Sequence, residues 1–181
     1  MSEVRRKVFI SYHHDDQDEV EEFIETFDYE RKVFITRGVG VDIEQEIIDS
    51  DDTDYVMRRI RELYLKDSTV TIVLMGKCTW ARRYVDWEIQ ASLRHGETVT
   101  ANGLLGIRLN SFKKSSYYPD RLNKNLKQGT EQEDCYARVI NYPVRKDTLA
   151  TWIEDAFHAR TSRANLIVNP KDRFKYNKTC P

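Results

Sequence analysis

Glycine, proline and cysteine are all scarce in this chain. Its 181 residues include seven glycines, four prolines and three cysteines. So few turn-forming residues argue against an all-β or disordered chain and favour strands covered by helices. Cys78, Cys135 and Cys180 are far apart in the sequence and form neither a CxxC motif nor a zinc-ligand spacing with histidine. We therefore expect reduced thiols and a cytoplasmic location.

The sequence also lacks long apolar runs and an excess of charge of either sign. Its longest apolar run, near Val70 to Met75, is far too short to span a bilayer, and the N-terminal residues lack the apolar stretch of a signal peptide. The net charge is −1 although 33% of the residues are charged. We expect a soluble protein with no general attraction to nucleic acid or membranes, which binds its ligands locally.

Short apolar runs alternate with amphipathic helical patterns along the chain. The predicted strands are 8–11, 33–36, 69–75, 104–109 and 137–141, and the predicted helices are 17–27, 55–65, 80–95 and 146–163. This alternation predicts an α/β, flavodoxin-like three-layer fold with a central parallel five-stranded sheet in the order 2-1-3-4-5. The first 163 residues form the predicted domain, and residues 164–181 form an extended tail.

The carboxyl ends of the first three predicted strands meet at one edge of this sheet. There, residues 11–15 and 76–79 should face each other across a crevice, and the sequence TRGVGV after the second strand should flank them. Open parallel sheets bind their ligands at such a crevice. The site is therefore expected at this edge.

Glu88 falls in the middle of the mostly apolar face of the predicted helix 80–95, with Tyr84 one turn before it and Ser92 one turn after it. A buried unpaired carboxylate is unfavourable. Glu88 is therefore predicted either to pair with a buried cation or to lie at the bottom of a pocket, and the pattern favours neither.

Three motifs carry a resemblance to a known family. VFISYHHDD, VTIVLMG and a helix containing YVDWEI are similar to TIR domains of the bacterial TIR-like family, and most closely to the TIR-like subunits of Thoeris antiphage systems. The resemblance covers residues 6–109. It departs at Tyr84, where many TIR domains have tryptophan, while Trp87 directly precedes Glu88.

The resemblance implies cleavage of NAD+ at the nicotinamide–ribose bond, with Glu88 as the catalytic residue. The residues that it places around the substrate are Ser11, Tyr12, His13, Arg37, Gly38, Tyr84 and Trp87. It implies NAD+ as substrate rather than cofactor, no metal, and a cyclic ADP-ribose isomer that signals to an effector protein. A homo-oligomer is also compatible with it.

Each of these assignments has a simpler alternative. The whole domain can be a non-catalytic TIR adaptor that acts by self-association. Gly38 and Gly40 fit an ordinary loop, and the acids after His13 fit helix caps better than a metal site. Trp87 fits the core as well as a ligand contact. The long connection 110–134 is predicted to be a lid or partner surface, with a short helix after Pro119, or else a polar excursion.

Overall fold

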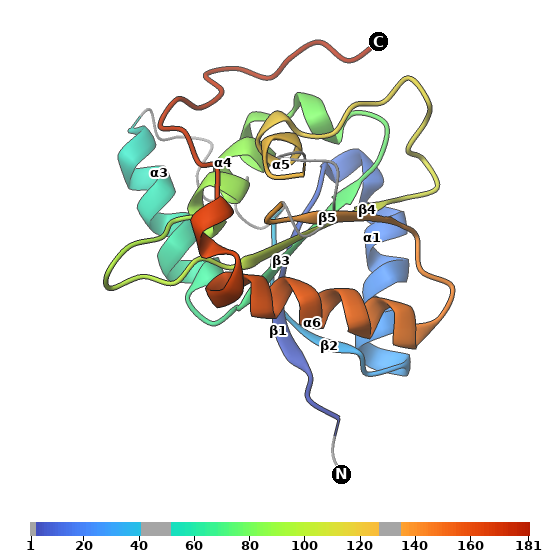
Figure 1. Ribbon diagram of the computed structural model, residues 1–181. Coiled ribbons are helices and arrows are strands. Elements are labelled where there is room, and N and C mark those ends of the chain that lie inside the picture. The colour runs from blue at the N-terminus through green and yellow to red at the C-terminus, as the bar shows by residue number, and fades with distance from the viewer. Residues whose placement is uncertain (1–2, 41–51, 127–134) are drawn as a thin grey trace.

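The computed structural model describes residues 3–40, 52–126 and 135–181 (Figure 1). Its five strands form one sheet in the order β2-β1-β3-β4-β5, with every neighbouring pair parallel. The predicted flavodoxin-like α/β fold is thereby confirmed. The strands are β1 (Arg6–Ser11), β2 (Phe34–Val39), β3 (Val70–Met75), β4 (Gly103–Arg108) and β5 (Arg138–Asn141).

Helices cover both faces of this sheet. They are α1 (Gln17–Ile24), α3 (Thr53–Ile60), α4 (Arg83–Ser92), α5 (Asp120–Lys124) and α6 (Lys146–Ser162). Single wider helical turns extend α1 to Glu30 and α3 to Leu65. The predicted short helix after Pro119 is α5. Among the described helices, none is long and apolar enough to cross a bilayer.

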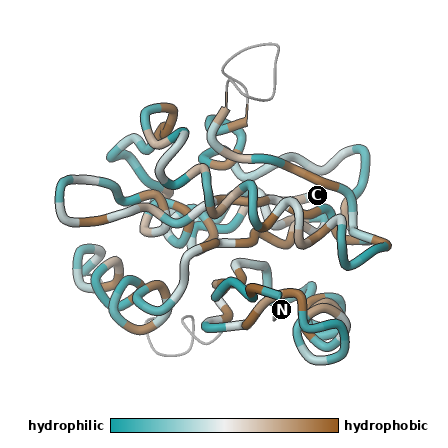
Figure 2. Tube along the Cα trace, turned by 60° about the horizontal axis from the view of Figure 1, so that its bottom comes forward, coloured by the Kyte–Doolittle hydropathy of each residue, from teal (hydrophilic) through white to brown (hydrophobic). Residues whose placement is uncertain are grey.

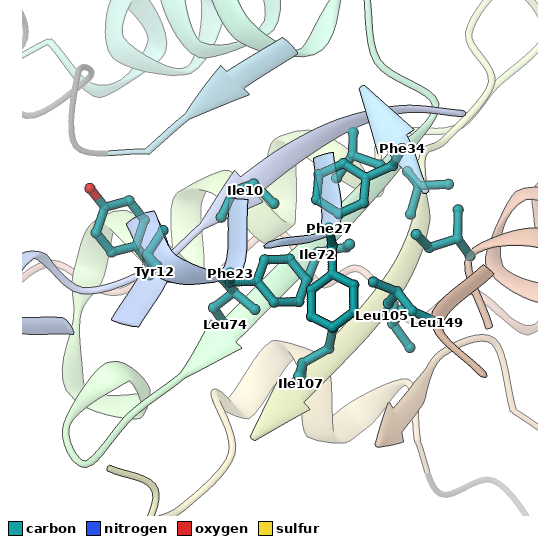
Figure 3. Close-up of a cluster of buried hydrophobic side chains, with 14 of the residues drawn as sticks. Ile10, Tyr12, Phe23, Phe27, Phe34, Ile72, Leu74, Leu105, Ile107 and Leu149 are labelled. Atoms are coloured by element: carbon teal, nitrogen blue, oxygen red, sulfur yellow. The ribbon is translucent and has the colours of Figure 1, made fainter. Parts of the chain in front are cut away.

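Alternation along β1 divides the core into two sides. Val8 and Ile10 face α1 and α6, where Phe23, Phe27 and other aromatic and aliphatic side chains form the largest apolar cluster (Figure 3). Phe9 points to the opposite face and packs against α3 and α4. Ser11, two residues after Phe9, therefore projects toward the α4 side of the sheet.

The hydropathy of the chain follows this layered arrangement. Brown, hydrophobic segments concentrate in the middle of the molecule, and teal, hydrophilic segments dominate the connections at its edges (Figure 2). β3 is buried at all six positions, as the most apolar predicted strand should be. A strand covered on both faces is expected at the centre of a parallel sheet.

Two local predictions were wrong. β2 continues to Val39, three residues beyond the predicted end, so Gly38 lies in a strand rather than a loop. The register with β1 shifts between Val8 and Phe9, which lets β2 accommodate one extra residue. Asp16 stands at the N-terminus of α1, but its side chain makes no capping hydrogen bond. It bonds across the crevice instead.

The C-terminal residues after α6 begin with a short helical turn and then continue without regular structure. Figure 1 shows this tail, in red, running past α4. Contacts along it include Trp87 Nε1 donating to the carbonyl of Phe174 at 2.8 Å and the Lys178 amide donating to the carbonyl of Ala81 at 2.8 Å. The predicted tail is thus bound along one side of α4.

Candidate active site at the carboxyl edge

Glu88 projects from α4 toward the end of β1 and is 1% exposed. The Ser11 hydroxyl donates a hydrogen bond of 2.5 Å to Glu88 Oε2. Ser11 is itself fully buried at the carboxyl end of its strand. The contact therefore joins the middle of the helix to the sheet edge where parallel α/β folds bind ligands.

Gly40 approaches the same carboxylate from the end of β2. Its amide donates to the carbonyl of Ile10 at 2.8 Å, which holds the chain beside β1. A Cβ atom at this position would lie 2.7 Å from Glu88 Oε1 and 2.9 Å from Oε2. Only a residue without a side chain lets the backbone come this close to Glu88.

Hydroxyl and amide side chains form a buried chain of hydrogen bonds behind Glu88. Ser92 Oγ donates to the backbone carbonyl of Glu88 at 2.8 Å and lies 2.7 Å from Thr71 Oγ1 on β3. Asn102 Nδ2 donates to Thr71 Oγ1 at 3.2 Å. This network ties α4 to the sheet and fixes the position from which the Glu88 side chain extends.

The predicted crevice between the ends of β1 and β3 is closed by hydrogen bonds. Thr79 Oγ1 donates to Asp16 Oδ2 at 3.3 Å, and Ser111 Oγ donates to Asp16 Oδ1 at 3.3 Å. Burial and the nearby charge of Glu19 raise the pKa of Asp16, and the two hydroxyls oppose that rise. Asp16, directly after the predicted segment 11–15, thus faces residues 76–79, and the connection after β4 joins them.

His13 lies at the entrance to the crevice and is 5% exposed. Its Nε2 is 3.2 Å from Asp15 Oδ2, and within the described chain its Nδ1 is buried without a hydrogen-bond partner. Burial lowers the pKa of His13 to about 4; Asp15 opposes the shift, and the positive charge of Arg82 adds to it. The imidazole is therefore neutral at pH 7.

Tyr12 and Arg37 point away from Glu88. Tyr12 follows Ser11 and so projects to the other face of the sheet, where it lies at the margin of the large apolar cluster (Figure 3). Arg37 Nε lies 3.2 Å from Asp67 Oδ2, a carboxylate just before β3 and thus at the amino edge of the sheet. The structure does not bring either residue to the Glu88 carboxylate.

Gly38 has a packing role in β2. A Cβ atom there would lie 2.9 Å from the ring of Phe9 and 3.3 Å from Tyr64. The glycine therefore lets the strand approach the aromatic side chains that separate the sheet from α3. The predicted contact between Gly38 and the substrate stays a prediction, and the strand geometry gives it no support.

Tyr84 and Trp87 lie together on α4, with ring centroids 5.3 Å apart. The guanidinium of Arg83 lies over both rings, at 5.1 and 5.4 Å from their centroids. The two aromatic residues line a groove of about 990 Å³ whose other wall is tail residues 171–176. They also pack against Phe9 in the apolar cluster under α3. Both residues therefore belong to the core and also line the groove.

The polar face of α4 carries a buried ion pair that sequence reasoning missed. Arg121, from the connection after β4, donates from Nε to Asp86 Oδ1 at 2.9 Å; the two side chains are 3% and 6% exposed. The amide of Phe174 donates to the second carboxylate oxygen of Asp86 at 2.9 Å. Helical periodicity alone does not predict this pairing, because Arg121 comes from the short helix α5 and Phe174 from the irregular tail, both distant from α4 in the sequence.

The same tail corrects the expectation for the cysteines. Cys180 forms a disulfide with Cys78 near the crevice, across 102 residues of sequence, and the two Cα atoms are 5.7 Å apart. Wide spacing suggested separate thiols, but the tail brings these two together. Cys135 is a buried free thiol.

One group in the described chain has the composition of a metal site. His13, His14 and Asp15 place ligand atoms within 4.8 Å of one another. Both histidines contact the same carboxylate, and two of the three residues are exposed. This arrangement supplies no further ligand in the described chain, so the expectation of a metal-free site stays a prediction.

The comparisons with known proteins concern the part of the chain that carries this site. Residues 9–114, more than half of the chain, match the family model described as "Thoeris protein ThsB, TIR-like domain". A protein of Bacillus cereus (strain MSX-D12), which carries the provisional name cyclic ADP-D-ribose synthase ThsB1, is 36% identical over 61 residues. That match spans 34% of this chain and 29% of the Bacillus protein.

Proposed function

This chain belongs to the family of Thoeris ThsB TIR-like domains, and from that premise we propose that it cleaves NAD+ at the nicotinamide–ribose bond. The observation that carries the proposal is the buried Glu88 carboxylate, which Ser11 holds at 2.5 Å at the carboxyl edge of the sheet. The name of the Bacillus relative supports a cyclic ADP-ribose isomer as product.

The proposed chemistry suits a single positioned carboxylate. Nicotinamide leaves NAD+ as a neutral molecule, so the bond breaks without a strong acid and leaves positive charge on the ribose. A preorganised anion beside that carbon stabilises the charge as it develops. Glu88 has this role in the proposal, and Ser11 is the positioning residue that fixes the direction of its carboxylate.

A cyclic product requires that a hydroxyl of the same ADP-ribose, rather than water, captures the ribosyl cation. Exclusion of water from the site favours that outcome. We propose that the product then signals to an effector protein of the Thoeris system, and that the active chain resides in the cytoplasm. Neither step needs a metal or a resident cofactor.

The burial of Glu88 also has a consequence for regulation. A side chain that is 1% exposed cannot contact a ribose until the atoms covering it move. We therefore expect the described state to be a resting one with low activity. A trigger acts, in this proposal, by uncovering the carboxylate and not by creating it.

The test is incubation of the chain with NAD+, at rest and with extract from infected cells, followed by chromatography of the nucleotide products. Glu88→Gln should remove product formation in both conditions and keep the fold. The matched control is Glu97→Gln, an exposed position beyond α4. Full activity of the Glu88→Gln chain would overturn the catalytic assignment. A triggered wild-type chain that forms no product would favour the adaptor alternative.

A further inference from the structure

Two adjoining cavities lie between α3, the end of α4 and the tail, at the amino edge of the sheet. The larger has a volume of about 770 Å³ and the smaller about 280 Å³. Both are lined by Arg61, Ala91 and Arg94, so they share one wall. Ser68 and Asn102, which come just before β3 and β4, line the larger cavity and place it opposite the carboxyl edge.

Basic side chains dominate the lining of these cavities. Six of the lining residues are basic, namely Arg58, Arg61, Lys66, Arg94, Arg160 and Arg173, and two are acidic. The acids are Glu62 and Asp54. Asp54 lies 3.8 Å from Arg173 and is 94% exposed, so that pair is weakly coupled. The excess of positive charge contrasts with the net charge of −1 of the whole chain.

Two of the arginines at the shared wall have no anionic partner. Within the described chain, the guanidinium groups of Arg61 and Arg94 make neither a hydrogen bond nor an ion pair within 4.0 Å. Burial lowers the pKa of Arg61, the positive charges of Arg94 and Arg173 lower it further, and the negative charge of Glu62 opposes this shift. The guanidinium groups therefore repel one another across the cavity.

Helix ends explain only part of this arrangement. The last turn of α4 exposes carbonyl groups that attract a cation, which suits Arg94. That effect is confined to the last turn and does not account for Arg61 and Arg173, which come from other segments of the chain. A cluster of like charges around a cavity instead favours binding of an anion that neutralises them.

We propose that this cavity is a second ligand site, which binds the phosphate groups of a small nucleotide. Arginine recognises phosphate oxygens through two parallel hydrogen bonds, and several arginines match a pyrophosphate better than a single carboxylate. Asn102, Ser68 and Ser92 add neutral polar side chains to the same wall, and their hydrogen bonds within the protein hold that wall in place. A cavity of this volume accommodates a mononucleotide or dinucleotide.

The site is separate from Glu88 but connected to it. Ser92 lines the cavity and donates to the backbone carbonyl of Glu88 at 2.8 Å. A ligand that orders this end of α4 therefore acts on the helix that carries the proposed catalytic carboxylate. Binding at this cavity does not depend on catalysis, and the two proposals can fail independently.

The test measures binding without turnover, in the Glu88→Gln chain at low salt, by titration calorimetry with ADP-ribose. Arg61→Gln combined with Arg94→Gln should weaken this affinity at least tenfold, and Arg145→Gln, at an exposed arginine before α6, should leave it unchanged. Pyrophosphate should show the same dependence on the two arginines. Adenosine should not bind at this site.

Unchanged ADP-ribose affinity in the double variant, or equal binding of adenosine, would overturn the proposal. Tighter binding of a short single-stranded RNA through the same arginines would replace it with a nucleic-acid surface. Arg94→Gln alone tests the exposed half of the site if the double variant does not fold. Nucleotide binding by a triggered wild-type chain that forms no product from NAD+ would contradict only the function proposed for Glu88.

Discussion

Asp86 and Glu88 are two buried carboxylates on the same helix, two residues apart, and the chain accommodates them in different ways. Asp86 is held by the guanidinium of Arg121 and by the amide of Phe174. Glu88 is held by the Ser11 hydroxyl and closely approached by Gly40. One carboxylate thus faces a cation from the short helix α5, and the other faces the carboxyl edge of the sheet.

The difference separates a structural acid from a candidate catalytic one. A guanidinium that fills both oxygens of a carboxylate neutralises the charge and leaves little capacity to stabilise another cation. The Ser11 hydroxyl fixes the direction of the Glu88 carboxylate at the sheet edge. Sequence pattern left an ion pair and a pocket as equal alternatives for Glu88, and both stay predictions; the ion pair of Asp86 with Arg121 is a separate one on the same helix.

The largest effect is expected from breaking the pair at Asp86. Asp86→Asn leaves the buried charge of Arg121 uncompensated, which typically lowers the free energy of unfolding by about 3–5 kcal/mol. Urea denaturation should show this loss, and amide exchange should speed up along tail residues 167–178. Asp120→Asn, at an exposed position on α5, should change the free energy of unfolding by less than about 1 kcal/mol.

Replacing both partners of this pair sharpens the comparison. Asp86→Leu with Arg121→Met removes two charges together, so it should recover much of the stability that Asp86→Asn loses. The same double replacement should leave Glu88 in place. If Glu88→Gln destabilised the chain as much as Asp86→Asn does, the distinction between the two carboxylates would be wrong.

His13 is a third buried ionisable residue, and it differs from the two carboxylates because its side chain is neutral at pH 7. Its pKa is about 4 in the folded chain and about 6.5 when unfolded, so the unfolded state binds more protons between these values. Its contribution to stability is present above pH 6.5 and is lost as the pH falls toward 4. Integrated over that interval, the loss amounts to about 2–3 kcal/mol.

Comparison with His13→Gln isolates this contribution from the carboxylates that titrate in the same range. Urea denaturation at pH 4.0 and 7.0 should show a smaller loss of stability in His13→Gln than in the wild type. His95→Gln, at an exposed histidine, should behave like the wild type. Equal losses in all three chains would show that His13 does not remain neutral when folded.

The sequence predicted the sheet order because periodicity and turn residues report directly on strands and helices. It also singled out Glu88, because a carboxylate on an apolar helix face breaks the pattern of its surroundings. Ser11 at the end of β1 followed from the strand assignment. These features depend on local sequence, where the physical signal is strongest.

The remaining parts of the site depend on contacts between distant segments. Arg121 reaches α4 from the short helix α5, and the tail reaches it through irregular backbone; a contact between segments so far apart in the sequence leaves no local pattern. The disulfide of Cys78 and Cys180 arises from the same contact. Arg37 was predicted from motif position alone, and its ion pair with Asp67 shows that a strand residue can project toward the opposite edge.

A smaller effect is expected at Ser11, whose hydroxyl distinguishes the Glu88 site from the Asp86 site. Ser11→Ala removes the hydrogen bond that directs the carboxylate and should lower kcat about tenfold, equivalent to about 1.4 kcal/mol in the barrier. KM should change little, because Ser11 positions Glu88 rather than the substrate. Ser11→Cys, of similar size and a weaker donor, should give intermediate activity. An increase in KM without loss of kcat would instead indicate direct substrate contact.

The smallest effect concerns the connection after β4, which supplies Arg121 to Asp86 and Ser111 to the crevice. The rings of Phe112 and Tyr118 stack with their centroids 5.7 Å apart, and the ring of Tyr117 meets that of Trp80 edge to face with centroids 5.0 Å apart. These aromatic side chains anchor the segment beside the site.

If the connection acts as a lid, deletion of residues 113–118 should admit water to the ribosyl cation and shift the product a few-fold from cyclic toward linear ADP-ribose. Arg121 and Ser111 remain in this deletion, so the fold and the Asp86 pair should persist. The test is the ratio of cyclic to linear ADP-ribose, measured by chromatography after activation. A lid that excludes water must change the share of the ribosyl cation that water captures, even when the overall rate is constant. An unchanged ratio of cyclic to linear ADP-ribose in a folded deletion variant would therefore reject the lid and leave partner binding as the role of this connection.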